Sequence, residues 1–329
     1  MEAVKSAEGR NPKAEGQSLL GWVLLAAGFG LLLWFIASWW SRTELAPGGL
    51  KLLIGAGFLI GALGLARVAN SFTKTTNALI AFVPAGLTLL LALVTVEALL
   101  RAYQVPVGLI PTPSRVLSTL VDVRQVLLQD AYQTVVLEAF TGWAVGSVLG
   151  VGFALLVSRF VFLERGFLPY ASAFSAIPIV ALAPVLVKMV GIEWQSKAII
   201  VAITVFFPVV VNTFRGLTEV SHMSLDLMRS YAASQLQNYS ALRIPNALPF
   251  IFNGLKLGTT LAMIGAIVGE FFGANGQGLG FRIQIEAGRF GFDIVWSAII
   301  VASVIGIAWY NAVAWVERRL TGWHVSFRE

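Results

Sequence analysis

Cysteine is absent from this chain of 329 residues, and histidine occurs only twice, at His222 and His324. The lack of cysteine excludes disulfides and thiol chemistry. No GxxxxGK[ST] segment is present, so the chain does not carry the phosphate-binding loop of P-loop ATPases. No spacing typical of metal ligands, and no grouping of serine, histidine and aspartate, indicates catalysis. We therefore expect no enzymatic activity, no bound metal and no cofactor.

Charged residues are also scarce, at 12% of the chain against 57% for hydrophobic residues. Soluble domains average about 25% charged residues. The net charge of +6 comes from lysines and arginines scattered between apolar runs. That distribution is typical of membrane topology and not of a nucleic-acid-binding patch. We expect contact with membrane lipid and none with nucleic acid.

Apolar runs recur along the chain, and about 20 such residues are needed to cross a bilayer. We predict an all-α polytopic membrane protein with eight spans: 19–40, 52–66, 79–100, 135–157, 167–190, 198–214, 249–268 and 294–316. Residues 1–17 are expected to be disordered and cytoplasmic. Two additional N-terminal helices fill 18–75, a six-helix core fills 79–320, and a cytoplasmic tail fills 321–329.

The orientation of the spans follows from the positions of the cations. Thirteen lysines and arginines are predicted inside and eight outside, with Lys197 among the eight. This excess inside agrees with the positive-inside rule. The second segment, 52–66, is short and glycine-rich, and the sequence leaves open whether it spans fully. If it only dips into the membrane, the N-terminus lies outside while the core keeps its orientation.

A polar stretch between two spans has a helical pattern and reads LDLMRSYAASQLQNYSALRIPNALPFIFNG from Leu225 to Gly254. Its apolar residues recur at steps of three and four, which predicts one face of a helix; they are Leu225, Met228, Ala232, Leu236 and Tyr239. Two short amphipathic helices at a membrane surface need a partner to pack against. A partner protein is the favoured interpretation.

The ends of these helices are marked by side chains that cap or interrupt them. Ser224 is expected to cap the first turn, where Asp226 also suits the helix dipole. Ser234 followed by Gln237 forms a capping box, which predicts that a second helix starts there. Pro245 and Pro249 are expected to end the helical pattern before the next apolar run.

The same stretch resembles the cytoplasmic "EAA" loop of importer-type ABC transporter permeases, whose pattern is E-A-A-x-x-x-G-A followed by L-P-x-x-x-P and a glycine. The matching positions here are Asp226, Ala232-Ala233-Ser234, Ile244-Pro245, Pro249 and Gly254. Leu227 and Met228 depart from the two alanines. Ala232 replaces the glycine, and alanine disfavours a positive φ. We therefore expect the bend in this loop to be made differently.

The resemblance covers residues 79–320 and implies a permease subunit of a binding-protein-dependent importer. Its implied partners are a second permease, usually an identical copy, an ATP-hydrolysing subunit and an extracytoplasmic solute-binding protein. The implied location is the cytoplasmic membrane of a prokaryote. The coupling loop, 222–246, would transmit force from the ATPase through Asp226, Arg229, Ala232, Ala233, Ser234, Arg243 and Pro245.

The substrate is less defined by the resemblance. The segments MRSYAASQLQNYSALRIPNALPFIFNGLK and IGAIVGEFFGANGQGLGFRI are most similar to the branch that imports thiamine-type pyrimidine precursors and riboflavin-like vitamins. Other branches of the same nitrate, sulfonate and taurine family remain alternatives. An ion-coupled secondary transporter is a further alternative. It would require buried acidic pairs at the midplane, and the predicted spans show none.

A few polar residues and prolines within the spans are candidates for the translocation path: Pro178, Pro184, Lys188 and Glu270. For Lys188, snorkelling to the interface is the favoured interpretation, and lining of the path is the alternative. Glu270 is expected either at a solvated helix end or in contact with a docked binding protein. Glu138 is expected at the membrane interface, with a structural ion pair as the second alternative. Lys256 is expected to be buried among helices.

Glycines recur at every fourth residue of the fourth span, at Gly142, Gly146 and Gly150. Small residues at this spacing allow close approach of helix backbones. The pattern favours helix packing over gating.

Overall fold

The computed structural model describes residues 12–40, 42, 44–72, 82–160, 162–163, 166 and 178–323. Several predicted segments fall partly or wholly outside these residues: most of the N-terminal segment 1–17, the start of the third span, residues 167–177 of the fifth span, and most of the tail 321–329. The described residues form helices joined by short turns and contain no strand. They form two compact units.

The first unit comprises the chain up to Val121 together with Phe290–Asp293. Its helices are α1 (Pro12–Trp39), α2 (Gly48–Phe72), α4 (Val83–Ala102) and α5 (Pro113–Asp122). Buried side chains from three of these helices form one core, which includes Leu32, Phe35, Ile54 and Leu91. The contacts divide the chain near Val121, whereas the sequence predicted a boundary between residues 75 and 79.

The α1 and α2 helices pack at glycines. A Cβ on Gly28 would lie 2.5 Å from the main-chain nitrogen of Gly61, which shows that the two backbones touch there. The apolar part of α2 extends over Gly48–Asn70, long enough to cross a bilayer. The predicted segment 52–66 was therefore too short, and α2 has the length of a complete span.

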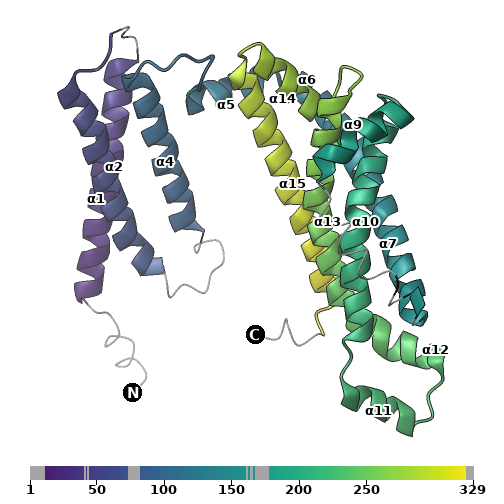
Figure 1. Ribbon diagram of the computed structural model, residues 1–329. Coiled ribbons are helices and arrows are strands. Elements are labelled where there is room, and N and C mark those ends of the chain that lie inside the picture. The colour runs from purple at the N-terminus through teal and green to yellow at the C-terminus, as the bar shows by residue number, and fades with distance from the viewer. Residues whose placement is uncertain are drawn as a thin grey trace, which may run out of the picture. The chain divides into compact units, whose positions relative to one another are not determined.

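The second unit comprises Asp122–Arg289 and the chain from Ile294 onward. It begins with one continuous helix made of α6 (Arg124–Ala131), the π-helical segment η1 (Tyr132–Phe140) and α7 (Thr141–Arg159). Then follow α9 (Ile179–Val190) and α10 (Trp194–Thr218). The α11 helix (His222–Ser230), α12 (Gln235–Asn238) and the π-helical η2 (Tyr239–Arg243) lie at one end of the bundle (Figure 1).

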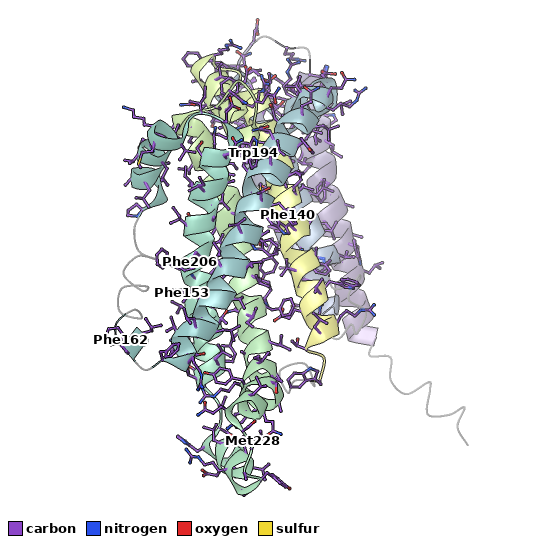
Figure 2. The ribbon with its side chains drawn as sticks, turned by 90° about the vertical axis from the view of Figure 1, so that its right-hand side faces the viewer. Phe140, Phe153, Phe162, Trp194, Phe206 and Met228 are labelled. Atoms are coloured by element: carbon purple, nitrogen blue, oxygen red, sulfur yellow. The ribbon has the colours of Figure 1, made fainter. Side chains whose placement is uncertain are left out.

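The long α13 helix (Ile244–Phe272) leads back through the bundle to α14 (Leu279–Gly288), which lies at the end opposite to α11 and α12 (Figure 1). The α15 helix (Phe292–Leu320) completes the chain. Trp194 and Met228 mark these two ends in Figure 2. The loop that resembles a coupling loop is therefore separated from α14 by the length of the bundle.

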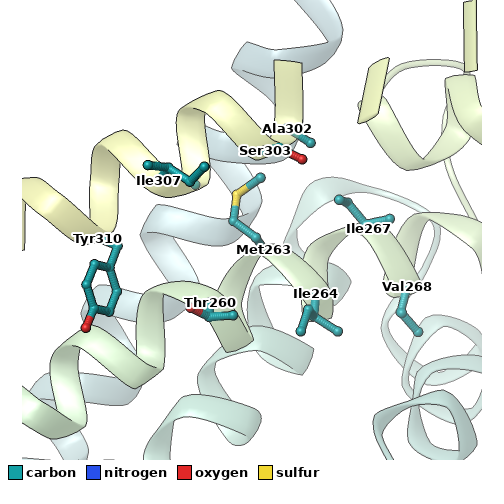
Figure 3. A pocket seen from close by; sticks show the side chains of 10 residues that line it. Thr260, Met263, Ile264, Ile267, Val268, Ala302, Ser303, Ile307 and Tyr310 are labelled. Atoms are coloured by element: carbon teal, nitrogen blue, oxygen red, sulfur yellow. The ribbon is translucent and has the colours of Figure 1, made fainter. Parts of the chain in front are cut away.

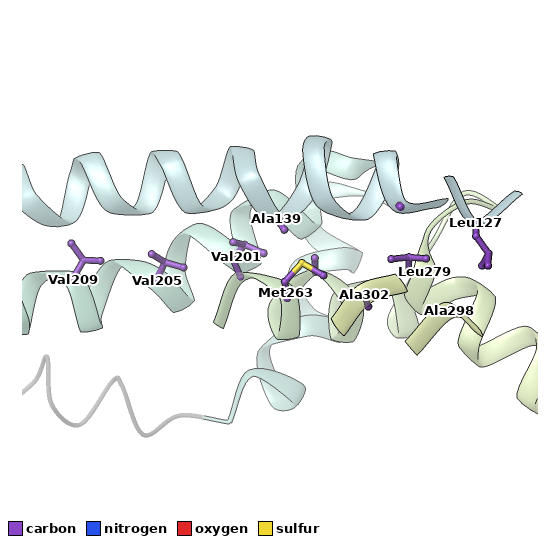
Figure 4. Close-up of a cluster of buried hydrophobic side chains, with 12 residues drawn as sticks. Leu127, Ala139, Val201, Val205, Val209, Met263, Leu279, Ala298 and Ala302 are labelled. Carbon is purple, nitrogen blue, oxygen red and sulfur yellow. The ribbon is translucent and has the colours of Figure 1, made fainter. Parts of the chain in front are cut away.

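Valines at every fourth residue of α10 build the core of this unit. Val201, Val205 and Val209 are fully buried and lie on one face of the helix, as the helical repeat requires (Figure 4). They belong to a cluster with Ala139 of η1 and Met263 of α13. The α10 helix is thus the central helix on which α7 and α13 pack.

Seven helices in the described part of the chain are long and apolar enough to cross a membrane, and α9 adds a shorter apolar helix, Ala181–Val190. This confirms the all-α polytopic fold. The spans are longer than predicted: the fourth runs from Arg124 to Arg159, and the seventh belongs to a helix that runs from Gln235 to Phe272.

Candidate functional site

The loop between α10 and α13 starts with the amphipathic helix α11. Its N-cap is Ser221, whose hydroxyl oxygen accepts a hydrogen bond from the main-chain nitrogen of Ser224 at 3.2 Å. The prediction that Ser224 itself is the cap was wrong by one turn, because both serines suit that position. Asp226 forms an exposed ion pair with Arg229, with 2.9 Å between Oδ1 and a guanidinium nitrogen. These two charges therefore remain accessible.

The bend after α11 is made at Ala232, which has a φ of +49°. The main-chain nitrogen of Ala232 donates to the carbonyl of Arg229 at 2.9 Å, and that of Ala233 donates to Met228 at 3.0 Å. This is the Schellman arrangement, in which glycine is the usual residue at the left-handed position. The expectation that the bend would be made differently was wrong, because Ala232 itself adopts the positive φ of the strained left-handed conformation.

The second helix of the loop begins as the capping box predicted. Ser234 accepts from the main-chain nitrogen of Gln237 at 3.3 Å, and Gln237 Oε1 accepts from the main-chain nitrogen of Ser234 at 2.7 Å. The helix then continues through η2 into α13 without a break. Pro245 lies in the first turn of α13 and Pro249 lies within it, so the prolines do not end the pattern as predicted. Proline fits the first turn of a helix, and at Pro249 the helix continues despite the missing N–H.

Side-chain contacts attach the loop to α7 and α10, and the chain itself continues from η2 into α13. Tyr239 donates its hydroxyl hydrogen to the carbonyl oxygen of Ser158, and Arg159 donates to Gln235, which fixes the loop to the end of α7. Arg243 donates to the carbonyl of Leu217 of α10 at 3.4 Å. A displacement of the loop is therefore passed directly to α7, α10 and α13.

No residue of α11, α12 or η2 is buried, and large apolar side chains are exposed on the loop beside charged and polar ones. Its exposed side chains include Met223 at 84%, Leu236 at 78% and Tyr231 at 76% of their full accessible surface, with Leu227 at 55%. Met228 lies on this part of the molecule in Figure 2. An exposed apolar surface rimmed by charges is typical of a protein-binding site.

The three candidates around α9 lie close together in sequence but differ in environment. Pro178 is the N-cap of α9, Pro184 lies within the helix, and Lys188 is in its last turn. The Lys188 side chain is exposed. The α9 helix packs against α10 and α13.

Glu270 lies in a buried polar cluster where α13 meets η1 and α14. It is 1% exposed, so the predicted solvated helix end was wrong. Its Oε1 accepts from the Thr134 hydroxyl at 2.6 Å, and its Oε2 accepts from the main-chain nitrogens of Gly280 at 2.5 Å and Phe281 at 3.1 Å. All of these partners lie on other elements, which is why the burial could not be predicted from the local sequence.

Two further charged residues of this cluster are more deeply buried than the sequence predicted. Glu138 is 1% exposed and interacts with Glu270, whereas an interfacial position was predicted. Lys197, counted among the external cations, is 1% exposed and donates through Nζ to the carbonyls of Ile192 and Glu193. Glu138 and Glu270 are thus a buried acidic pair near the end of α13, and not at the midplane, where the sequence predicted that such a pair is lacking.

Lys256 of α13 is partly buried and lies 2.6 Å from a carboxylate oxygen of Glu317 of α15. The predicted position among helices is confirmed. The partner is a buried glutamate at the end of the last span.

The glycines of α7 lie against α10. A Cβ on Gly146 would be 3.0 Å from the Cα of Ala202, and one on Gly150 would be 3.0 Å from the carbonyl oxygen of Phe206. A Cβ on Gly142 would overlap the carbonyl oxygen of Ala198. The three glycines permit the close approach of these two helices.

A groove of about 550 Å³ runs between α13 and α15 (Figure 3). It is lined by Thr260, Met263, Ile264, Ile267, Val268, Ala302, Ser303, Gly306, Ile307 and Tyr310. These residues include hydroxyl groups and no charged side chain. Within the described residues, no group of three or more histidine, aspartate or glutamate side chains is placed to hold a metal ion.

Seven membrane-length helices in the described residues and a helical loop with exposed apolar side chains are the features of a multi-pass membrane protein. Residues 146–322, more than half of the chain, match the family described as "Binding-protein-dependent transport system inner membrane component". The chain belongs to this family of ABC importer permeases. Such permeases work with an ABC ATPase and a substrate-binding protein.

Individual relatives carry different substrates in their names. The formylaminopyrimidine transport permease protein ThiX of Halalkalibacterium halodurans is 31% identical over 65% of this chain and 86% of its own length. The riboflavin transport system permease protein RibX of Chloroflexus aurantiacus is 32% identical over 50% of this chain and 61% of its own. The taurine transport system permease protein TauC of Escherichia coli is 31% identical, over 53% and 62% respectively.

The fold has a solved counterpart in an inward-facing structure of the MetNI methionine ABC transporter. The match has a TM-score of 0.52 at 19% identity and covers 61% of this chain and 98% of the other. At that identity, the similarity supports the fold alone.

Proposed function

We propose that this permease forms the translocation path for a flat heterocyclic vitamin or vitamin precursor in the cytoplasmic membrane of a prokaryote. The observation that carries the proposal is the similarity to permeases named for formylaminopyrimidine and riboflavin. The lining of the groove between α13 and α15 is apolar with hydroxyl groups and no charge. Such a surface suits an uncharged aromatic ring and would leave a sulfonate without a cationic partner.

The loop 222–246 is proposed as the docking segment for the ATP-hydrolysing subunit. Its exposed apolar side chains favour this role, with Asp226, Arg229, Ala233 and Ser234 on or beside the bend. Its attachments to α7 and α10 would convert a movement of the ATPase into a movement of the bundle. In this proposal the loop transmits force and carries no chemistry.

A second permease subunit is proposed to complete the path. The apolar window of α15 is only 22% buried within this chain, so most of it is available to lipid or to another subunit. We propose an identical copy as the partner, with Pro178, Pro184, Lys188 and Glu270 beside the path. Cross-linking of two differently tagged copies in native membranes tests this arrangement.

The docking proposal is tested by purifying the tagged chain from native membranes in mild detergent. An ATP-hydrolysing subunit should co-purify with the unchanged chain and be lost with Ala233→Glu, which places a charge beside the bend. Ala274→Glu is the matched control, because it adds the same charge to the turn at the opposite end of the bundle. Equal recovery of the ATPase in all three samples would contradict the docking proposal.

Substrate class is tested separately, by uptake of labelled riboflavin, formylaminopyrimidine and taurine in cells with and without the permease. We expect uptake of one of the two heterocycles to depend on the permease. Uptake of taurine alone would favour the second candidate, a sulfonate importer, which the taurine relative supports. That outcome would leave the docking proposal intact.

A further inference from the structure

The first turn of α14 is held entirely by side chains from other helices. Main-chain nitrogens at the start of a helix have no partner within it. Here Gly278 donates to Asp130 Oδ1 at 2.9 Å, and Leu279 donates to Thr134 Oγ1 at 2.8 Å. Gly280 and Phe281 both donate to Glu270 Oε2. Three side chains therefore satisfy four consecutive N–H groups.

The fit around this turn is close. A Cβ on Gly280 would lie 2.6 Å from the carbonyl oxygen of Ile267, and one on Gly278 would overlap the carboxylate of Glu270. Arg282 adds an ion pair, with 2.8 Å between its Nε and Asp130 Oδ2. Leu279 is completely buried in the main core of the unit. The turn thus covers the end of that core.

The contacts that hold the turn are hydrogen bonds and an ion pair, with no covalent link. Just before the helix, Gly276 and Gly278 have positive φ values, +93° and +122°, which glycine adopts without steric cost. Glu270 would not be left without charge compensation if the turn moved away. Lys197 faces both Glu270 and Glu138, while its ammonium group is bound in this structure to main-chain carbonyls.

We propose that the first turn of α14 is a lid at the outer end of the permease, latched by Asp130, Thr134 and Glu270, that lifts when the path opens to the outside. The proposal rests on the orientation proposed above, which places the end opposite to the docking loop outside the cell. Glu270 is then a positioning residue: it holds the lid through hydrogen bonds and contacts no substrate in this role.

Because the chain contains no cysteine, a single cysteine can be introduced at the lid and labelled without background from other thiols. Leu279→Cys places a thiol beneath the lid, and an impermeant maleimide added to intact cells reports its exposure. Labelling follows the population of the open form when closing is fast. We expect slow labelling in ATP-depleted cells and faster labelling in energised cells. Equal rates in the two conditions would overturn the proposal.

The latch is tested by adding Glu270→Met to the Leu279→Cys variant, which keeps the size of the side chain and removes its acceptors. We expect labelling of the introduced thiol in depleted cells to rise at least tenfold, equivalent to about 1.4 kcal/mol. Glu270→Gln is the matched control, because an amide oxygen can still accept from Gly280 and Phe281. Labelling as slow with methionine as with glutamine would overturn the assignment of Glu270.

Controls separate lid opening from unfolding and from wrong orientation. Ala183→Cys, fully buried in a separate cluster on α9, should stay protected in the Glu270→Met background. If this buried thiol becomes labelled, the milder Thr134→Val replaces Glu270→Met, with the same expectation. This change removes the acceptor for Leu279 and one donor to Glu270.

Gln277→Cys provides the control for orientation, because this residue lies in the exposed turn and should be labelled in every background. Its protection from the outside would overturn both the lid and the orientation. If the Gln277→Cys thiol is labelled but the Leu279→Cys thiol reacts equally slowly in ATP-depleted and energised cells, the lid alone is overturned.

Discussion

Tyr239 of η2 donates its hydroxyl hydrogen to the carbonyl oxygen of Ser158 in the last turn of α7, over 2.8 Å. The two residues are 81 positions apart in sequence. This contact ties the proposed docking loop to a helix other than the two that it connects. A displacement of the loop therefore acts on α7 as well as on α10 and α13.

Tyr239→Phe removes this hydrogen bond and keeps the ring. One neutral hydrogen bond contributes about 0.5–1.5 kcal/mol, so we expect uptake to fall about two- to tenfold while the ATPase subunit still co-purifies. Tyr132→Phe makes the same chemical change on an exposed side chain outside the loop and should have no effect. Loss of uptake in both variants, or in neither, would refute a role for the contact in coupling.

The strained bend of the loop gives a second prediction. Ala232 has a φ of +49° at the position where a Schellman motif prefers glycine. Left-handed conformation costs a non-glycine residue about 1–2 kcal/mol. We expect Ala232→Gly to preserve or raise the melting temperature of the purified complex with the ATPase, and Ala232→Val to lower it. A valine variant as stable as the parent would contradict the assigned geometry.

The parts of the fold that the sequence could predict are those set by local pattern. Span positions follow from apolar run length, and the second loop helix follows from the Ser234–Gln237 capping box, because both signals involve neighbours in the chain. Glu138, Lys197 and Glu270 were misjudged for the opposite reason. Each is buried by helices that are distant in sequence, and a residue near a predicted span end gives no sign of what covers it.

The conformation of the turn at Ala232 was predicted wrongly, for a specific reason. Intrinsic preference argues against a positive φ for alanine, but the hydrogen bonds of Ala232 and Ala233 to the preceding turn hold the backbone there. Similarly, Pro249 lies within α13 although proline disfavours a helix interior. In both cases the surrounding structure outweighs the preference of one residue.

The ion pair between Lys256 and Glu317 gives a third prediction. The two side chains are 18% and 6% exposed, and the pair joins α13 to α15. Lys256→Met leaves the glutamate buried without its partner, which costs about 3–5 kcal/mol for a buried pair. We expect a clear fall in melting temperature in detergent. The double variant Lys256→Met with Glu317→Leu should recover much of the loss, and a double variant no more stable than the single one would argue against coupling between the two side chains.

The glycines of α7 give the last prediction, for which the same helix provides its own control. Gly146→Ala places a methyl group against the backbone of α10, at 3.0 Å from the Cα of Ala202. Overpacking of this kind costs about 1–3 kcal/mol. Gly152→Ala meets no atom within 4 Å, and alanine favours a helix over glycine by about 1 kcal/mol. We therefore expect opposite shifts in melting temperature from the same chemical change. A stabilising effect at Gly146 would mean that α7 and α10 do not approach as closely as the structure places them.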